Sequence, residues 1–345
     1  MVPRMVTRAG LAGLAAVGAL AWLQQEPVAL TQDSGTTVRL VAVSAPTANI
    51  AWVSGAKGTW VKTTDAGLTW KTGQVQGAES MDFRDVQGID GNNAYLLAAG
   101  TGQSSRIYHT TDGGATWRLQ FTNMDSAGFY DCMDFWDDHH GIVVGDATHG
   151  ELAILTTTDG EKWARLSARD FPPPLDKEGS FASSGTCVTT LPGGRAWIAT
   201  TKGRVLRTTD FGKTWQVSLT PLAGGADTLG ATSVSFINPK VGVVFGGYGA
   251  VPGGVGVAVS SDGGASWTAT ARPDFPGAAW GGAFVKSALK QTIVAVGPGG
   301  SAYSRDNGAT WMPIDKRNYW GLGFSPGNRG WAVGAAGRIT RLSGF

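Results

Sequence analysis

Short apolar runs alternate with turn-forming residues along most of the chain. Seven of these runs share one pattern and end in Gly or another small residue, at 51–55, 94–98, 141–145, 196–199, 242–246, 293–297 and 330–334. A second short run follows each of them, as at 58–62, 203–207 and 337–341. Runs of this length, bounded by turn residues, are typical of β-strands. No helix of consequence is expected, so the pattern predicts an all-β protein.

An eight-residue motif follows the paired runs and recurs with few changes. Its first copy reads Thr63-Thr-Asp65-Ala-Gly67-Leu-Thr-Trp70; further full copies begin at 110, 208, 260 and 304, and a copy one residue short begins at 157. Successive copies start 47, 47, 51, 52 and 44 residues apart. This spacing is the length of a four-stranded blade in a β-propeller.

The chain carries seven strand pairs but only six motifs. It stops at Phe345, before a seventh motif, while residues 27–32 precede the first blade without a blade of their own. We therefore expect residues 36–345 to form a single seven-bladed β-propeller with four-stranded blades. The N-terminal segment, residues 22–35, is expected to supply the strand that completes the last blade and closes the ring.

The Asp and Trp residues of the motif are predicted to be structural. An Asp carboxylate can accept hydrogen bonds from N–H groups of its own turn, Gly tolerates a positive φ, and Trp buries a large apolar face. Six copies of one turn suit a structural role better than six active sites. The residues concerned are Asp65, Trp70, Asp112, Trp117, Asp159, Trp163, Asp210, Trp215, Asp262, Trp267, Asp306 and Trp311.

Composition supports a fold of many short strands and tight turns. The 345 residues include 52 Gly and 14 Trp, and only 16% are charged. Average proteins have about 7% Gly and about 25% charged residues. A hydrophobic fraction of 42% is enough for a large core and excludes a disordered chain.

The first residues have the features of an export signal. Arg4 and Arg8 precede an uncharged apolar stretch over 9–23, which is shorter than a bilayer span, and Ala19-Leu20-Ala21 fits the site read by signal peptidase. We expect residues 1–21 to be a cleaved signal peptide and the mature protein to be periplasmic or secreted. The alternative is an uncleaved anchor, because Trp22 and Leu23 extend the apolar run. No Cys follows the run, so acylation is not expected.

Loss of residues 1–21 would remove the net positive charge. The full chain has 28 Lys and Arg against 26 Asp and Glu, and both extra cations, Arg4 and Arg8, lie in the leader. A neutral mature domain lacks the basic surface that phosphate backbones require. Nucleic acid is therefore not an expected partner.

The repeated motif resembles the Asp-box, or bacterial neuraminidase repeat (BNR). In layout the chain resembles the Ycf48-like photosystem II assembly factors, in 83–86, 133–141 and 330–339, and resembles an exported bacterial subgroup of them in 129–136 and 184–187. The resemblance covers 36–345. It implies a propeller and favours a protein-binding or assembly role, and it implies no settled chemistry. A sialidase would need a Phe-Arg-Ile-Pro motif, whereas Phe83-Arg84 is followed by Asp85-Val86.

Alignment of the predicted inner strands points to a group of polar residues near one mouth of the central channel. It places Asp85, Asp131, Thr186, Thr232, Gly282 and Trp320 at equivalent positions, with Arg84 and Tyr130 beside them. The same face collects Asp82, Asp146, His149 and the long insert 168–184, whose Pro172-Pro-Pro174 run could stiffen a lid or rim.

Two functions remain open for this face. The first is binding of a partner protein or an extended peptide, with Arg84, Asp85, Tyr130, Asp131, Asp146 and His149 as contact residues. The second is glycoside hydrolase-like catalysis by the carboxylates of Asp85 and Asp131, with a glycan as substrate. In a purely structural interpretation, both carboxylates line a polar channel. We favour a binding module over an enzyme, and expect a monomer.

No cofactor or metal is expected. No Gly-rich phosphate loop opens a helix, and the histidine pair His139-His140 lacks further ligands at metal-binding spacing. Cys132 and Cys187 are the only cysteines, and they fall within one step of the same inner-strand position in blades three and four. In an exported protein they could form a disulfide, although the divergence of inner strands leaves two free thiols as the alternative.

Overall fold

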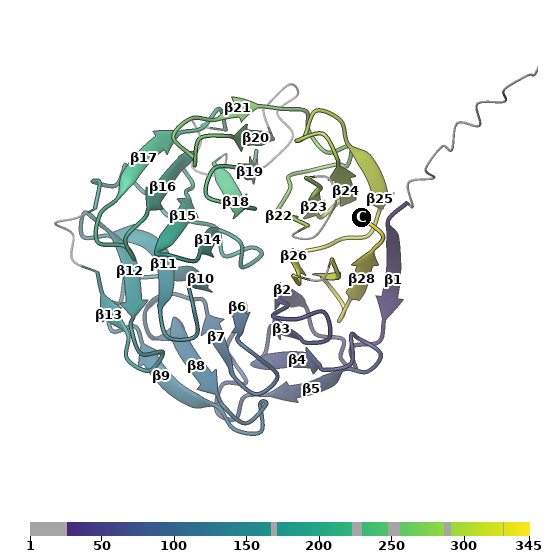
Figure 1. Cartoon of the computed structure of the whole chain (residues 1–345). Helices are drawn as coiled ribbons and strands as arrows, with labels where there is room; N and C mark the ends of the chain where they lie inside the picture. Colours follow the sequence, from purple (N-terminus) through teal and green to yellow (C-terminus); the bar gives the residue numbers. More distant parts are fainter. Residues whose placement is uncertain (1–25, 167–170, 223–229, 248–255, 286–290, 327) are drawn as a thin grey trace, which may run out of the picture.

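The fold is a closed ring of seven sheets. The computed structural model describes residues 26–166, 171–222, 230–247, 256–285, 291–326 and 328–345, and these form seven four-stranded antiparallel sheets around a central axis (Figure 1). The predicted all-β, seven-bladed propeller is confirmed. The predicted signal peptide, residues 1–21, lies outside the described residues.

Each blade runs from an inner strand at the axis to an outer strand at the rim. The first three blades consist of β2 (Leu40–Ser44), β3 (Ala51–Gly55), β4 (Thr59–Thr63) and β5 (Lys71–Gln74); β6 (Phe83–Gly88), β7 (Ala94–Ala98), β8 (Arg106–Thr110) and β9 (Arg118–Thr122); β10 (Tyr130–Phe135), β11 (Gly141–Thr148), β12 (Glu151–Thr157) and β13 (Ala164–Arg165). A 3-10 turn, η1 (Gly102–Ser104), lies between β7 and β8.

The remaining blades repeat the same order. They consist of β14 (Val188–Leu191), β15 (Arg195–Ala199), β16 (Arg204–Thr208) and β17 (Gln216–Leu219); β18 (Ala231–Phe236), β19 (Gly242–Gly246), β20 (Val257–Ser260) and β21 (Thr268–Ala269); β22 (Gly281–Phe284), β23 (Ile293–Gly297), β24 (Gly300–Ser304) and β25 (Met312–Asp315); β26 (Gly321–Phe324), β27 (Gly330–Val333), β28 (Ile339–Ser343) and β1 (Val28–Gln32).

The N-terminal strand closes the ring. β1 pairs antiparallel with β28, from Val28 opposite Ser343 to Gln32 opposite Ile339, so the last blade takes its outer strand from the start of the chain (Figure 1). This is the closure that the sequence predicts. β1 thereby covers the outer edge of β28, to which another chain could otherwise add.

The Asp-box turns are held by hydrogen bonds from their own residues. In the first box, Asp65 Oδ1 accepts the Thr69 N–H at 2.9 Å and the Thr63 hydroxyl at 2.8 Å, and Asp65 Oδ2 accepts the Thr69 hydroxyl at 2.6 Å. The boxes at Asp112, Asp210, Asp262 and Asp306 repeat this pattern. These bonds lower the pKa of Asp65, Asp112 and Asp262 to about 2.

On the outer strands β9 and β17, a polar side chain bonds to the Asp-box of the following blade. Gln120 on β9 accepts the indole N–H of Trp163 at 3.0 Å and donates to Gly160 O at 2.9 Å. Ser218 on β17 does the same for Trp267 and Gly264. Each pair gives the box Trp N–H an acceptor, because a buried donor without one would cost free energy.

Gln32 on β1 makes the same kind of contact where the ring closes. Its Oε1 accepts the indole N–H groups of Trp70 in blade one, at 3.3 Å, and Trp331 in blade seven, at 3.1 Å. Its Nε2 donates to Gly67 O in the first Asp-box. A single amide therefore joins the last blade to the first.

Replacement of Gln32 by Ala should weaken the closure of the ring more than replacement of any other outer-strand side chain. The variant leaves two indole donors unpaired, so we expect a loss of about 2 kcal/mol in the free energy of unfolding. Hydrogen exchange of residues 28–32 should also become faster. Gln120→Ala is the matched control, because it breaks like contacts inside the ring and should leave exchange of β1 unchanged. Equal exchange of β1 in wild type and Gln32→Ala would contradict this role.

The Asp-boxes should make stability depend on acid pH. Their folded-state pKa values lie below the ordinary Asp value of 3.8, so their contribution is present above about pH 4 and is lost as pH falls towards 2. Urea midpoints measured between pH 7 and pH 2 should fall over this interval. Asp112→Asn should be less stable at pH 7 and should show a shallower fall. Midpoints that stay flat between pH 4 and pH 2 would contradict the assignment.

Candidate functional site

Strand pairing corrects the predicted alignment of the channel residues by one position. The bulge in β6 lies between Phe83 and Asp85, and that in β10 lies between Tyr130 and Cys132. Asp85 therefore corresponds to Cys132, while Asp131 takes the position of Arg84. The expectation that Asp85 and Asp131 are equivalent is wrong by one residue. Tyr95 and Ile142 hold matching positions in the second strands, and Asp85 lies ten residues before Tyr95 whereas Asp131 lies eleven before Ile142.

Asp85 bonds to the neighbouring blade rather than facing an open mouth. It is only 2% exposed, its Oδ1 accepts the Val86 N–H at 2.7 Å, and its Oδ2 accepts the Met133 N–H of β10 at 2.7 Å. Burial raises the pKa of Asp85 well above its usual value, and the two N–H donors oppose that rise. The Asp85 carboxyl thus gives a partner to the Met133 N–H, which lies at the free edge of β10 and would otherwise be unpaired.

Side chains of two other inner strands also accept an N–H from the next inner strand. Asp134 Oδ2 accepts the Thr190 N–H of β14 at 2.7 Å. In blade five, Ser235 Oγ accepts the Phe284 N–H of β22 at 3.2 Å. Side chains of one inner strand therefore satisfy the backbone of the next.

Asp131 is buried under a loop that covers the channel. Asp131 is 2% exposed. Burial, with a contribution from the nearby Asp146, raises the pKa of Asp131 well above its usual value. Hydrogen bonds from the N–H groups of Ser180 and Ala182, and the charge of Arg84, oppose this rise. Its Oδ2 has no hydrogen-bond partner among the described residues. The carboxyls of Asp85 and Asp131 are thus held separately in the interior, not as an open pair able to reach a sugar.

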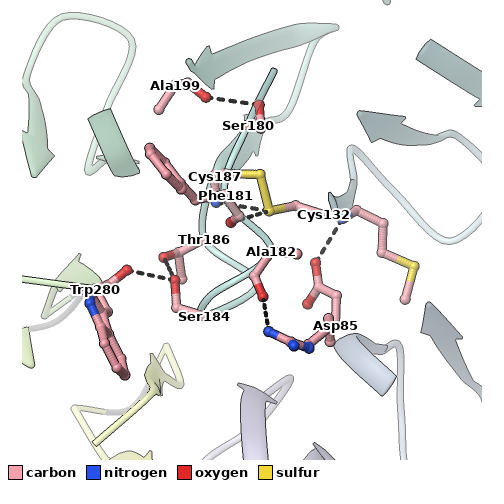
Figure 2. The surroundings of a disulfide bond; sticks show 12 residues. Asp85, Cys132, Ser180, Phe181, Ala182, Ser184, Thr186, Cys187, Ala199 and Trp280 are labelled. Atoms are coloured by element: carbon pink, nitrogen blue, oxygen red, sulfur yellow. Dashed lines mark hydrogen bonds between the residues drawn. A yellow bond between two sulfur atoms is a disulfide. The ribbon is translucent and has the colours of Figure 1, made fainter. Parts of the chain in front are cut away.

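Residues Gly179–Cys187, here called the plug loop, lie across one end of the channel (Figure 2). The loop bonds to four separate blades or their connections. Ser180 Oγ donates to Ala199 O at 2.9 Å, Ser184 Oγ to Trp280 O at 2.8 Å, the Val234 N–H to Thr186 O at 2.9 Å, and Arg84 Nη1 to Ala182 O at 3.0 Å.

Gly185 brings the plug loop closest to the axis. It has a φ of 72°, and a Cβ there would lie 2.2 Å from Asp85 Oδ1 and 2.7 Å from the Ala42 Cβ of blade one. At Gly321, in blade seven, a Cβ would lie 2.8 Å from Ser184 O. Through these approaches the plug loop contacts every blade, and only Gly fits at position 185.

A disulfide joins the end of the plug loop to blade three. Cys132 of β10 and Cys187, which precedes β14, are linked, with their Cα atoms 6.0 Å apart, and both residues are fully buried (Figure 2). The Cys187 N–H points at Cys132 Sγ at 3.3 Å. Of the two alternatives that the sequence leaves open, the structure has the disulfide.

An internal ion pair holds the other end of the plug loop. Glu178, which is 1% exposed, accepts a hydrogen bond from Arg204 Nε at 2.8 Å and another from Nη2. Arg204 Nη2 also donates to Pro173 O at 3.1 Å. The insert predicted to be a lid or rim is therefore fixed against β16 in its described part, 171–184, and turns inward to the axis; residues 168–170 lie outside the described residues.

Below the plug loop the channel is a blind cavity of about 260 Å³. Its closed end is formed by Asp85, Gly185 and Thr186, and it extends to the loops that join first and second strands, at Pro46 and Pro326. The channel mouth is thus not an open site on the side where the sequence predicts one.

A cluster of arginine and tryptophan side chains lies beside the plug loop on its outer side. Asp82 Oδ2 accepts hydrogen bonds from Arg39 Nη2 and Arg84 Nε, both at 2.6 Å. The two guanidinium groups lie over the Trp320 ring, at 4.7 and 5.4 Å from its centroid, and Trp320 packs on Trp280. We call these five residues the Arg–Trp cluster. Two cations share one carboxylate, so the Arg–Trp cluster carries a net positive charge.

The other predicted contact residues are placed less favourably. Tyr130 is 3% exposed and packs on Phe121, so it is unavailable to a partner. His149, at the β11–β12 turn, is exposed and contacts Asp125 Oδ1 at 3.2 Å. Asp146 is partly buried, which raises its pKa, and lies against Gly179. Of the predicted set, Arg84 alone belongs to the Arg–Trp cluster.

Within the described residues, no group of three or more His, Cys, Asp or Glu side chains could hold a metal ion. His139 and His140 lie in an exposed turn, where His140 Nδ1 is 2.9 Å from Asp137 Oδ1.

Sequence reasoning missed the participation of Arg39 and Trp280 and the inward turn of the insert. Arg39 precedes the first inner strand, at a position with no repeat signal. The one available signal for the insert was Cys187 at its end, since a disulfide to an inner strand must draw the insert towards the axis.

Comparison with known proteins finds similarity to the family that the repeats resemble. Residues 21–125 match the family described as photosynthesis system II assembly factor YCF48. The chain resembles Ycf48. Curated relatives named photosystem II assembly lipoprotein Ycf48 are 26% identical over 172 residues (Prochlorococcus marinus, strain MIT 9312) and 27% identical over 150 residues (Synechococcus sp., strain CC9902). These matches cover 50% and 43% of this chain, and the chain spans only 46% and 40% of the relatives' length.

The fold likeness extends further than the sequence likeness. The structure of YCF48 from Cyanidioschyzon merolae superposes with a TM-score of 0.65 at 17% identity, covering 92% of this chain and 99% of that one. At this identity the comparison supports the seven-bladed architecture. It carries no residue-level function.

The relatives are named lipoproteins, which are exported proteins. Among the residues that the structure describes, no helix is long and apolar enough to cross a bilayer.

The disulfide should stabilise the protein by fixing the plug loop. The link closes a loop of 55 residues, for which chain entropy predicts about 4 kcal/mol, at the upper end of the typical range of about 2–4 kcal/mol. Cys132→Ala with Cys187→Ala should lose stability of this size, measured by urea denaturation without reductant. Thiol titration of the denatured wild type, before reduction, should find no free thiol. Two free thiols would contradict the assignment.

Proposed function

We propose that this chain is an exported binding module that grips a protein partner, or an extended segment of one, through the face around the plug loop. The Arg–Trp cluster carries the proposal. Arg39, Asp82 and Arg84 have side chains 33%, 27% and 26% exposed, so their charges are reachable yet held in place. Arginine over an aromatic ring is a common anchor at protein interfaces.

The composition of the cluster favours binding over catalysis. Guanidinium groups cannot serve as general acids or bases near neutral pH, since their pKa is above 12. The carboxyls with strongly raised pKa values, Asp85 and Asp131, are buried beneath the plug loop and used for backbone contacts. The matching family's description, assembly factor, and the relatives' name, assembly lipoprotein, agree with a binding role. By the same reasoning we propose that the chain has no enzymatic activity, and, as a separate proposal, that it acts as a monomer.

The expected partner chemistry follows from the cluster. Its excess positive charge favours a carboxylate or carbonyl-rich segment. The hydroxyl groups of a glycan would bind the same guanidinium groups, so a glycan is the second ligand to test.

Arg84→Ala should reduce recovery of the partner in a pull-down from periplasmic extract by at least about fivefold, because one charge-assisted contact is lost. Arg118→Ala is the matched control: Arg118 is also paired with a carboxylate, that of Glu161, but lies on the outer strand β9 and should not affect recovery.

Thermal unfolding of each variant separates loss of contact from loss of fold. If Arg84→Ala recovers the same proteins in the same amounts, the proposed face is wrong. A glycan array probed with the wild type covers the second ligand class.

A further inference from the structure

A second polar pocket lies on the opposite face of the ring, where the Asp-boxes lie. It is between blades four and five, has a volume of about 230 Å³, and is lined by Arg195, Trp197, Arg207, Gln216 and Asp262 among others. The plug loop and the Arg–Trp cluster contribute nothing to it. Its chemistry is therefore independent of the function proposed above.

The matched position in blade one shows what such a cation does when its role is purely structural. Lys62, opposite Trp52, donates to Gly91 O at 2.8 Å and to Gly113 O at 3.0 Å and lies over the Trp52 ring. The Lys62 ammonium group is therefore bound by carbonyl oxygens of the following blade.

Arg207, opposite Trp197 in blade four, is not satisfied in this way. Its Nη1 makes one long contact of 3.4 Å to Gly263 O, which already accepts the Trp197 indole N–H at 2.8 Å. Its Nε is buried and has no hydrogen-bond partner among the described residues. An unpaired buried donor costs free energy, so the protein does not supply the Arg207 guanidinium with a full set of acceptors.

Arg195, on the neighbouring strand β15, adds a second guanidinium to the pocket. Its side chain makes one hydrogen bond with a described residue, a long one of 3.5 Å from Nη1 to Pro192 O. Neither Arg195 nor Arg207 forms an ion pair with any carboxylate that the structure describes. Two forked donors therefore line one cavity without an anion.

Asp262 lines the pocket but cannot be that anion. Its carboxylate accepts hydrogen bonds from Ser260 Oγ, the N–H groups of Ala265 and Ser266, and Ser266 Oγ, at 2.6–3.0 Å. These four donors belong to its own turn. With two arginines and one occupied carboxylate, the lining carries a net charge of +1, which suits a singly charged ligand better than a phosphate dianion.

We propose that this pocket binds a carboxylate of a peptide, either an acidic side chain or a free chain terminus. Arg207 and Arg195 bind the two oxygens through their guanidinium forks, and the Trp197 ring forms an apolar wall beside them.

The Arg207 Nε–H resonance in ¹H–¹⁵N spectra reports directly on the pocket. Three probes are titrated against the full chain: an N-acetylated, C-amidated Gly-Ser-Glu-Ser-Gly peptide, its Gln counterpart, and an acetylated Gly-Ser-Gly-Ser-Gly peptide with a free terminus. The first, the third, or both should shift the Arg207 signal to saturation, and which of them does so identifies the source of the carboxylate. The Gln peptide should not.

Arg207→Gln and Arg195→Gln should each weaken binding about tenfold, as expected for loss of a charge-assisted contact. Arg195→Gln removes a side chain with a single long contact, so its fold should be intact even if Arg207→Gln is destabilised. Lys62→Gln is the matched control and should leave the affinity unchanged. If no carboxylate peptide shifts the Arg207 signal, or the Gln peptide binds equally well, the proposal is wrong.

Discussion

Every blade of the ring presents the free edge of its first strand towards the axis, and these edges hold backbone N–H and C=O groups that need partners. Seven sheets cannot pair edge to edge around a narrow channel, so the partners come from elsewhere. Asp85, Asp134 and Ser235 each accept an N–H from the next inner strand, and the plug loop supplies carbonyls and hydroxyls across the channel end. Burial of the two central carboxyls follows from this constraint.

The same constraint decides where function can lie. A channel closed by the plug loop, and tied there by the Cys132–Cys187 disulfide and the Glu178–Arg204 pair, leaves its polar residues for structural use. The accessible chemistry lies instead on the two faces. One face carries the Arg–Trp cluster around the plug loop, and the other carries the arginine pocket between blades four and five.

The sequence was sufficient for the fold because the Asp-box repeats at blade spacing and each copy depends on its own residues. Asp65 bonds to Thr63 and Thr69 of its own turn, so the turn can be predicted from its local sequence. The segment 27–32, which has no blade of its own, predicted the closure by β1. The site was less predictable. Strand pairing places Asp131 at the position of Arg84 rather than that of Asp85, and contacts such as that of Arg84 with Ala182 join residues 98 apart in the chain. No local pattern records contacts of this kind.

Sealing of the channel by the plug loop is the central claim, and hydrogen–deuterium exchange of Gly179–Cys187 tests it most directly. The N–H groups of Gly179 and Cys187 are hydrogen-bonded, and those of Ser180 and Ala182 point to the buried Asp131. These amides should exchange as slowly as those of the inner strands β10 and β14. Exchange as fast as that of the exposed turn 137–140 would mean that the loop leaves the channel readily, and would contradict the account.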